Sequence, residues 1–151
     1  MFGVPRKTMR DVHEAALRLL KNRSYSEYEL TNRLLADGYT EEETQATLAS
    51  LIRVGLVNDN QYARDFIQLR LLHRPCGRAL LAAELCAKGI SSQTAWEALE
   101  ELYPRNQESE YAEQAIKSRF GKPITGKKAA TFLANRGFDE EIVWRYLEAV
   151  T

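Results

Sequence analysis

The sequence of 151 residues has few of the features that mark secreted or membrane-spanning proteins. It has only two cysteines, Cys76 and Cys86, which cannot form a disulfide framework. Its hydrophobic runs are a few residues long, far below the roughly 20 that a membrane-spanning helix needs. Residues 1–10 are charged and lack the apolar stretch of a secretory signal. We therefore expect a cytoplasmic protein of a reducing compartment, with no membrane partner.

Residues suited to catalysis are also scarce. The two histidines, His13 and His73, lie far apart, and no serine or cysteine near either forms a known nucleophile motif. His73 and Cys76 have a metal-like spacing, but a closed zinc site needs two further ligands. The sequence has no glycine-rich phosphate loop. We therefore expect a protein that is not an enzyme and has no metal or cofactor.

The sequence does contain a repeated unit. Three glycines, Gly38, Gly89 and Gly137, are about fifty residues apart, and a leucine precedes each of them by one helical turn. Each glycine is followed by a large apolar residue and then by a residue that can cap a helix. The pattern predicts three copies of one supersecondary unit, and hence an elongated array whose function lies on a long surface.

Apolar residues spaced three and four apart predict helices along the chain, and no segment reads well as a strand. Each unit contains three helices, and the second helix ends at the repeated glycine in a left-handed conformation. We predict an all-α fold, an elongated tandem array of three three-helix modules. Residues 1–9 would form an N-terminal tail, and residues 10–56, 57–104 and 105–151 would form the modules.

Local signals locate helix starts and the core. Ser26 with Glu29 has the form of a capping box, and Ser24 is an alternative cap. Trp96 and Trp144 occupy equivalent repeat positions, which favours core residues between helices over base-stacking platforms. Further caps are predicted at Thr40, Ser91 and Asp139. The predicted core includes Leu30, Leu34, Leu35, Leu48, Leu51, Ile52, Ile67, Leu69, Leu85, Leu99, Leu133 and Ile142.

Three stretches carry a resemblance to a known family. They read Ser-Glu-Tyr-Glu-Leu at residues 26–30, Gly-Leu-Val-Asn-Asp-Asn-Gln-Tyr-Ala at residues 55–63, and Glu-Leu-Cys-Ala-Lys-Gly-Ile at residues 84–90. The chain thereby resembles the RecX recombination regulators from about His13 to Val150. The second and third stretches are fairly specific, whereas the first alone is weak. The resemblance implies tandem three-helix modules, in agreement with the triplication.

The resemblance also implies a function. RecX proteins bind the RecA nucleoprotein filament and modulate, usually inhibit, its strand exchange, ATP hydrolysis and coprotease activity. This chain would accordingly act in homologous recombination, DNA repair and the SOS response, and we expect it to be a monomer. It departs from the family pattern before the fifth helix, where relatives often carry an aromatic residue near the position of Cys76. The departure affects docking if that aromatic residue contacts the partner.

Charges segregate along the chain although 21 basic residues balance 21 acidic ones overall. Residues 114–138 contain no acidic residue, and acids gather instead on the third helix of each module. A basic stripe is therefore expected on the first and second helices of modules two and three, suited to phosphates or to an acidic protein groove. The predicted contact residues for the RecA filament, or for the backbone of single- or double-stranded DNA, are Arg64, Arg70, Arg74, Arg78, Lys88, Lys117, Arg119, Lys122, Lys127, Lys128 and Arg136.

Two other functions fit the same residues. A helix-turn-helix-like triplet that enters the major groove would make the chain an autonomous DNA-binding module. A generic helical adaptor is the other alternative, in which the charges are a solvated surface arranged as helix dipoles favour.

Overall fold

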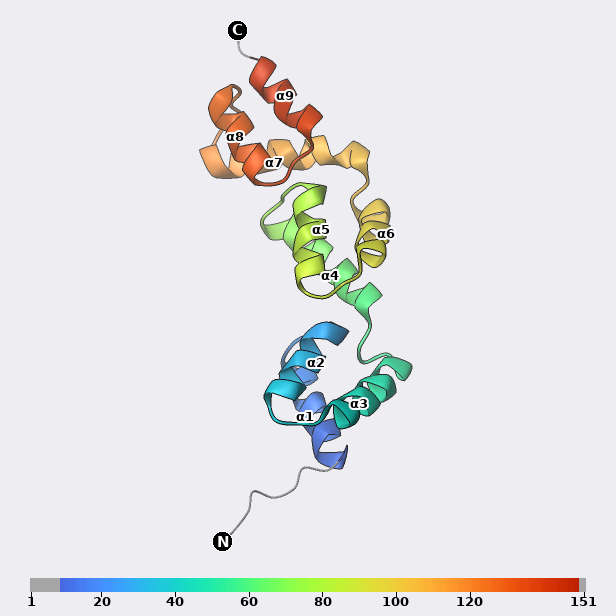
Figure 1. The fold of residues 1–151 in the computed structure, drawn as a ribbon. Helices are drawn as coiled ribbons and strands as arrows, with labels where there is room; N and C mark the ends of the chain where they lie inside the picture. The colour runs from blue at the N-terminus through green and yellow to red at the C-terminus, as the bar shows by residue number, and fades with distance from the viewer. Residues whose placement is uncertain (1–8, 150–151) are drawn as a thin grey trace. The chain divides into compact units, whose positions relative to one another are not determined.

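The computed structural model describes residues 9–149, and this part of the chain contains helices and no strand (Figure 1). The all-α prediction is thus confirmed for the described residues. The chain divides into two compact units, Met1–Tyr62 and Ala63–Thr151. The predicted module boundaries stay a prediction. The helices described are α1 (Met9–Asn22), α2 (Glu27–Ala36), α3 (Glu41–Arg53), α4 (Asp59–His73), α5 (Arg78–Ala87), α6 (Ser92–Leu102), the short η1 (Arg105–Gln107), α7 (Glu108–Phe120), α8 (Lys127–Asn135) and α9 (Glu140–Glu148).

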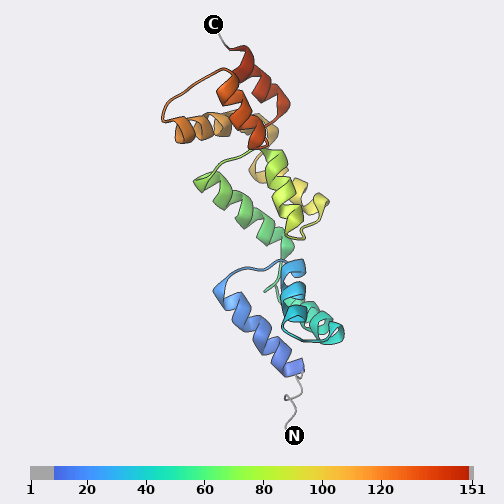
Figure 2. The ribbon, with the colours of Figure 1, turned by 60° about the vertical axis from the view of Figure 1, so that its left-hand side comes forward.

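In the first unit, α1, α2 and α3 pack on one another around a small apolar core. Figure 2 shows the dark blue α1 beside the lighter α2 and the teal α3. The largest side chains of this core are fully buried, since each helix turns one apolar stripe inward. They are Val12, Leu30, Leu34, Leu51 and Val57.

Side-chain caps fix where the helices begin. The Ser26 hydroxyl accepts the Glu29 N–H at 3.1 Å, and the Glu29 carboxylate accepts the Ser26 N–H at 3.1 Å. This capping box confirms Ser26, rather than Ser24, as the cap of α2. The predicted caps Thr40, Ser91 and Asp139 are confirmed at α3, α6 and α9.

The repeated glycines end the second helix of each triplet as predicted. Gly38, Gly89 and Gly137 have φ angles of 98°, 87° and 75°. These left-handed angles suit glycine because it has no Cβ atom.

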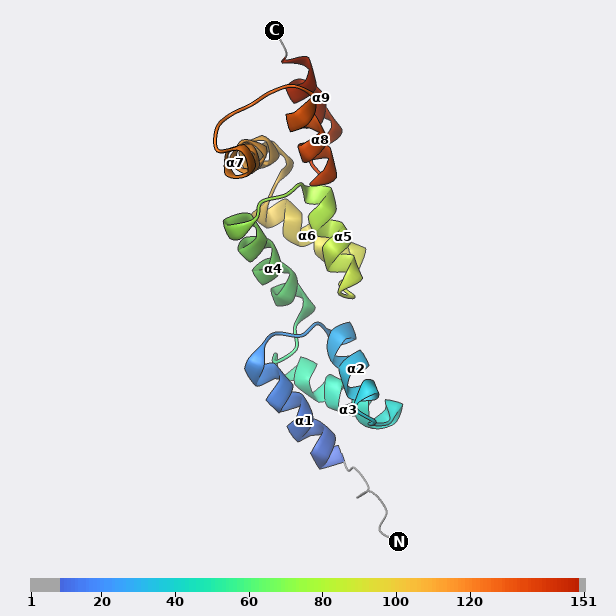
Figure 3. The ribbon, with the colours of Figure 1, turned by 90° about the vertical axis from the view of Figure 1, so that its left-hand side faces the viewer.

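The second unit contains α5 to α9 together with α4 from Ala63 onward, and its two helix triplets meet backbone to backbone. The Gly77 N–H, just before α5, donates to the Arg136 carbonyl, just after α8, at 2.8 Å. A Cβ atom on Gly77 would overlap the carbonyl oxygen of Gly137. Figure 3 shows this end of α8 against the start of α5. The hydrogen bond and this close approach both involve main-chain atoms. The α4–α6 triplet therefore packs directly against the α7–α9 triplet.

Beside this junction, a buried polar side chain fixes each triplet internally, and one aromatic contact joins the two. The buried Glu108, first residue of α7, accepts the Asp139 N–H at 2.7 Å. The buried Tyr103 donates its hydroxyl to the Cys76 carbonyl at 2.8 Å, and its ring lies 5.0 Å from that of Tyr111. Burial raises the pKa of the Glu108 carboxyl.

Several residues assigned to the core are exposed, so these predictions were wrong. Trp96 and Trp144 are 38% and 51% exposed, and Leu35, Ile52 and Leu69 are 39%, 41% and 60% exposed. A three-helix unit is small, so each helix buries only a narrow stripe, and side chains at its margin stay in contact with water.

Candidate functional site

The predicted contact residues differ in what surrounds them. Three arginines of α4 and α5 face acids. Arg64 makes two hydrogen bonds to the Glu101 carboxylate, at 2.6 and 2.7 Å, which raise the pKa of Arg64. A guanidinium nitrogen of Arg70 lies 3.5 Å from a carboxylate oxygen of Glu84. These partners neutralise much of the positive charge expected on the middle triplet.

Arg78 is the third of these arginines, and only 8% of it is exposed. Its Nε donates to the Tyr103 carbonyl at 2.8 Å, and it forms an ion pair with Glu100. Its guanidinium also lies over the Trp96 ring, 5.2 Å from the ring centre. The side chain therefore holds α5 against the end of α6.

Cys76 also lies in the interior of the second unit. It is fully buried, and burial raises the pKa of its thiol. Position 76 is thus part of the core, and the Cys76 side chain is not exposed to a partner.

A cluster of four arginines lies where the ends of α4, α7 and α8 meet. Burial and the nearby charges of Arg74, Arg70 and Arg119 lower the pKa of Arg136. The Arg136 guanidinium also donates to the Pro75 carbonyl at 3.5 Å. Arg70 Nε is buried without a hydrogen-bond partner. Like charges gathered in this way are stabilised when an anion binds between them.

The acid-free segment places five exposed cations on α7, α8 and the loop between them. No ion pair joins them, or the half-buried Arg136, to a carboxylate in the part of the chain that the structure describes. The unpaired positive charge of the second unit is therefore concentrated in its last triplet. The five exposed residues are Lys117, Arg119, Lys122, Lys127 and Lys128.

Two hollows contain four of these five cations, and Lys122 lines neither of them. The first, which we call the α7–α8 groove, has a volume of about 530 Å³. Phe120 and Phe132 line it together with Arg119, Lys127 and Lys128, and no carboxylate does. The α8 helix begins here at Lys127, and the preceding Gly126 has no side chain to cap the helix. The remaining lining residues are Thr131 and Asn135.

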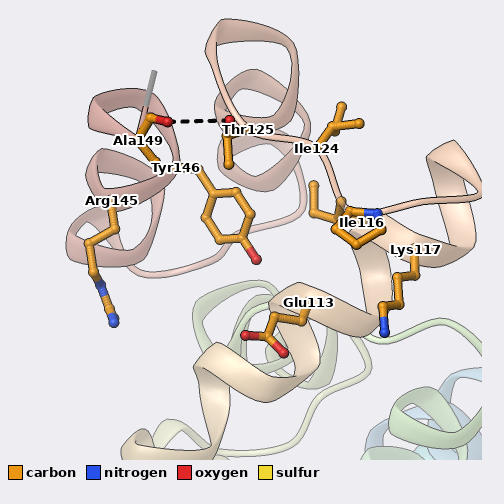
Figure 4. A pocket seen from close by; sticks show the side chains of 9 residues that line it. Glu113, Ile116, Lys117, Ile124, Thr125, Arg145, Tyr146 and Ala149 are labelled. Atoms are coloured by element: carbon orange, nitrogen blue, oxygen red, sulfur yellow. Dashed lines mark hydrogen bonds between the residues drawn. The ribbon is translucent and has the colours of Figure 1, made fainter. Parts of the chain in front are cut away.

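The second hollow, the α7–α9 pocket, lies on the other flank of α7 and has a volume of about 460 Å³ (Figure 4). The Tyr146 ring points into it, with Ile116, Ile124 and Lys117 on the α7 and loop side. Burial and the Glu113 carboxylate raise the pKa of Tyr146. Because Lys117 lines this pocket and not the α7–α8 groove, it is separated from the cations of that groove.

Lys88 lies outside both hollows. Its ammonium is 5.8 Å from the centre of the Phe66 ring, on the side of α4 and α5. The structure thus brings together Arg70, Arg74, Arg119 and Arg136, and separately Arg119, Lys127 and Lys128, but it does not bring all eleven predicted residues onto one face.

The aromatic pair Phe120 and Phe132 was missed as part of a site. Both have the helical spacing of core residues, and both are half-buried. The available signal was the charge beside each ring, since Arg119 directly precedes Phe120, and Lys128 and Arg136 lie four residues before and after Phe132.

Neither a metal site nor a membrane-spanning helix is found among the described residues. They contain no group of three or more histidine, cysteine or acidic side chains placed to hold a metal ion. Among the helices of that same part of the chain, none has the length and apolar character to cross a membrane.

Helical triplets and a concentrated set of unpaired cations define a class of helical binding protein. Comparison with known proteins identifies the family. Residues 13–51 match the family model for RecX, first three-helix domain, and residues 58–99 match that for RecX, second three-helix domain. The chain belongs to the RecX family.

Relatives and solved structures agree. The regulatory protein RecX of Chromohalobacter salexigens is 38% identical over 132 residues, which cover 85% of each chain. That of Pelodictyon phaeoclathratiforme is 33% identical over 126 residues, 82% of this chain and 79% of the relative. The crystal structure of RecX from Lactobacillus salivarius superposes with a TM-score of 0.75 at 20% identity, over 94% of this chain and 97% of that one. The family and the non-enzymatic, regulatory class predicted from the sequence are thus confirmed.

Proposed function

We propose that this protein binds the RecA nucleoprotein filament and inhibits its strand exchange, ATP hydrolysis and coprotease activity. The observation that carries the proposal is membership of the RecX family, whose relatives are named regulatory proteins. Its role would lie in recombination, DNA repair and the SOS response, in the cytoplasm.

The contact surface that we propose consists of predicted cations on α7, on α8 and on the segments that follow α4, α7 and α8, none of which has an ion pair in the described part of the chain. Exposed lysines and arginines without acidic partners keep their charge available, so they attract an acidic surface and speed its encounter. Arg64 and Arg78 are excluded because their guanidinium groups already bind Glu101 and Glu100. The proposed surface consists of Arg74, Lys117, Arg119, Lys122, Lys127, Lys128 and Arg136.

Co-sedimentation with RecA assembled on DNA tests this function. We expect the wild type to pellet with the filament at low salt, and the double substitution Lys127→Glu with Lys128→Glu to reduce the bound fraction about tenfold or more, since each reversal turns an attraction into a repulsion. Both side chains are exposed, so the fold should be unaffected.

A control with the same charge change is Lys21→Glu with Arg53→Glu, two exposed residues of the first unit. This variant should pellet like the wild type. Wild-type protein that stays in the supernatant at low salt would overturn the proposed function.

A further inference from the structure

The floor of the α7–α8 groove is a pair of aromatic rings. Phe120 is the last residue of α7, and Phe132 lies in the middle of α8. Their ring centres are 5.5 Å apart and their planes meet at 78°, an edge-to-face pair. Each ring is half-buried, so one part packs against the core and another part faces the groove.

Cations surround this floor at ring-contact distance. The Arg119 guanidinium lies 5.1 Å and the Lys128 ammonium 6.0 Å from the Phe120 ring centre. The Arg136 guanidinium lies 4.9 Å from the Phe132 ring centre. Positive charges therefore flank both aromatic rings. Since Arg119 and Lys128 are exposed, each can exchange its ring contact for a stronger one with an anionic oxygen.

This combination suits an unpaired nucleotide. A nucleotide base that is not paired can place its face or edge on an aromatic ring, whereas the bases of a duplex are already stacked and enclosed. Each phosphate carries a negative charge that lysine and arginine neutralise. The neutral side chains Thr131 and Asn135 add groups that can donate and accept hydrogen bonds in the same groove.

The charge extends beyond what one nucleotide requires. Arg136 contacts the Phe132 ring and also belongs to the cluster with Arg70 and Arg74. Lys127 and Lys128 lie at the start of α8, and Arg136 follows its end, so cations are present at both ends of the helix. Such a row matches successive phosphates of a chain better than the phosphate of a free nucleotide.

We propose that the α7–α8 groove binds single-stranded nucleic acid, with an unpaired base against Phe120 and Phe132 and its phosphates at Arg119, Lys127 and Lys128. The site goes beyond the proposed action on RecA and does not require it. Its test therefore contains no RecA, so that failure of one proposal leaves the other standing.

Fluorescence anisotropy of a labelled thymidine oligonucleotide tests the site. The wild type should bind it more tightly than a duplex of the same length. Phe120→Leu and Phe132→Leu keep an apolar side chain but remove the ring, and each should weaken binding of the single strand about tenfold, as expected for a lost stacking contact. Circular dichroism of each variant checks that it is folded.

Charge variants test the phosphate contacts without changing a core residue. Lys127→Gln with Lys128→Gln should lower the slope of log affinity against log salt by about 1.4, because each phosphate contact on a single strand contributes about 0.7. Lys117→Gln with Lys122→Gln removes the same charge outside the groove and should leave that slope unchanged.

Four results would overturn the site. One is duplex binding as tight as single-strand binding with no effect of the phenylalanine variants, which would favour the helix-turn-helix-like alternative. A second is an equal loss of salt slope in the two lysine variants. A third is displacement of the labelled oligonucleotide by stoichiometric thymidine monophosphate, which would indicate a free-nucleotide pocket. A fourth is displacement by a polyglutamate peptide more readily than by unlabelled oligonucleotide, which would indicate a protein site.

Discussion

At the scale of single residues, position rather than charge decides what an arginine does in this protein. Arg74 and Arg78 are four residues apart on either side of the Pro75–Gly77 turn, and both were predicted to contact a partner. Arg74 is exposed, whereas Arg78 is buried and bonded to the Tyr103 carbonyl and the Glu100 carboxylate. One belongs to the proposed contact surface and the other to the junction between α5 and α6.

This difference predicts opposite effects of one substitution. Arg78→Met should lower the free energy of unfolding by about 2 kcal/mol, because charged hydrogen bonds in the interior are lost and a buried carbonyl is left without its donor. Arg74→Met should change it by less than about 0.5 kcal/mol, as is usual for exposed sites. Urea unfolding measures both. Equal unfolding midpoints for the two variants would contradict the structural role of Arg78.

The sequence could not separate these two arginines. An acid-poor segment can be read directly from the chain, and it identified the exposed lysines of α7 and α8. The partners of Arg64 and Arg78, by contrast, are Glu101 and Glu100 on α6, more than twenty residues away, and only the packing of α6 brings them near. The same holds for Trp96, whose ring covers the Arg78 guanidinium rather than filling the core.

At the scale of helices, the contact between the start of α5 and the end of α8 holds the two triplets of the second unit together. Gly77 has a φ of −72°, which any residue can adopt, so glycine is required there only because the main chain of Gly137 is so close. Gly121 is the reverse case. It has a φ of 77° and open space where a Cβ atom would lie, so only its backbone angle favours glycine.

Replacing each glycine by alanine separates these two effects. Gly77→Ala should destabilise the protein by about 3 kcal/mol, since the added methyl group must push two main chains apart. Gly121→Ala should cost only about 1 kcal/mol, the strain of a left-handed alanine. Thermal unfolding compares them under one condition. A smaller loss for Gly77→Ala than for Gly121→Ala would show that the junction tolerates separation.

Most of the helical architecture could be predicted because its signals are local. Capping boxes and helix-ending glycines depend on residues within four positions of each other, and Ser26, Thr40 and Gly89 all behave as expected. The junction at Gly77 could not be predicted, because its partner lies about sixty residues further along the chain and no periodic pattern links the two. The prediction of burial failed at the margin of a helix for a related reason, since tertiary packing leaves Leu35 and Ile52 39% and 41% exposed.

At the scale of the whole molecule, a balanced composition conceals an uneven distribution of available charge. The acids of α6 pair with Arg64 and Arg78, while the cations of α7 and α8 have no carboxylate partners in the part of the chain described. A neutral protein can therefore present a basic surface. The family, the fold and the non-enzymatic class followed from repeats and motifs, whereas the distribution of charge required the structure.

The central claim is that this protein inhibits RecA, and its most direct test is a titration into RecA-catalysed ATP hydrolysis on single-stranded DNA. The filament is assembled first, so that competition for free DNA does not enter. We predict that the rate falls as the protein approaches a stoichiometric ratio to RecA, and that Lys127→Glu with Lys128→Glu requires a higher concentration for the same fall. An unchanged rate at stoichiometric wild-type protein would contradict the account.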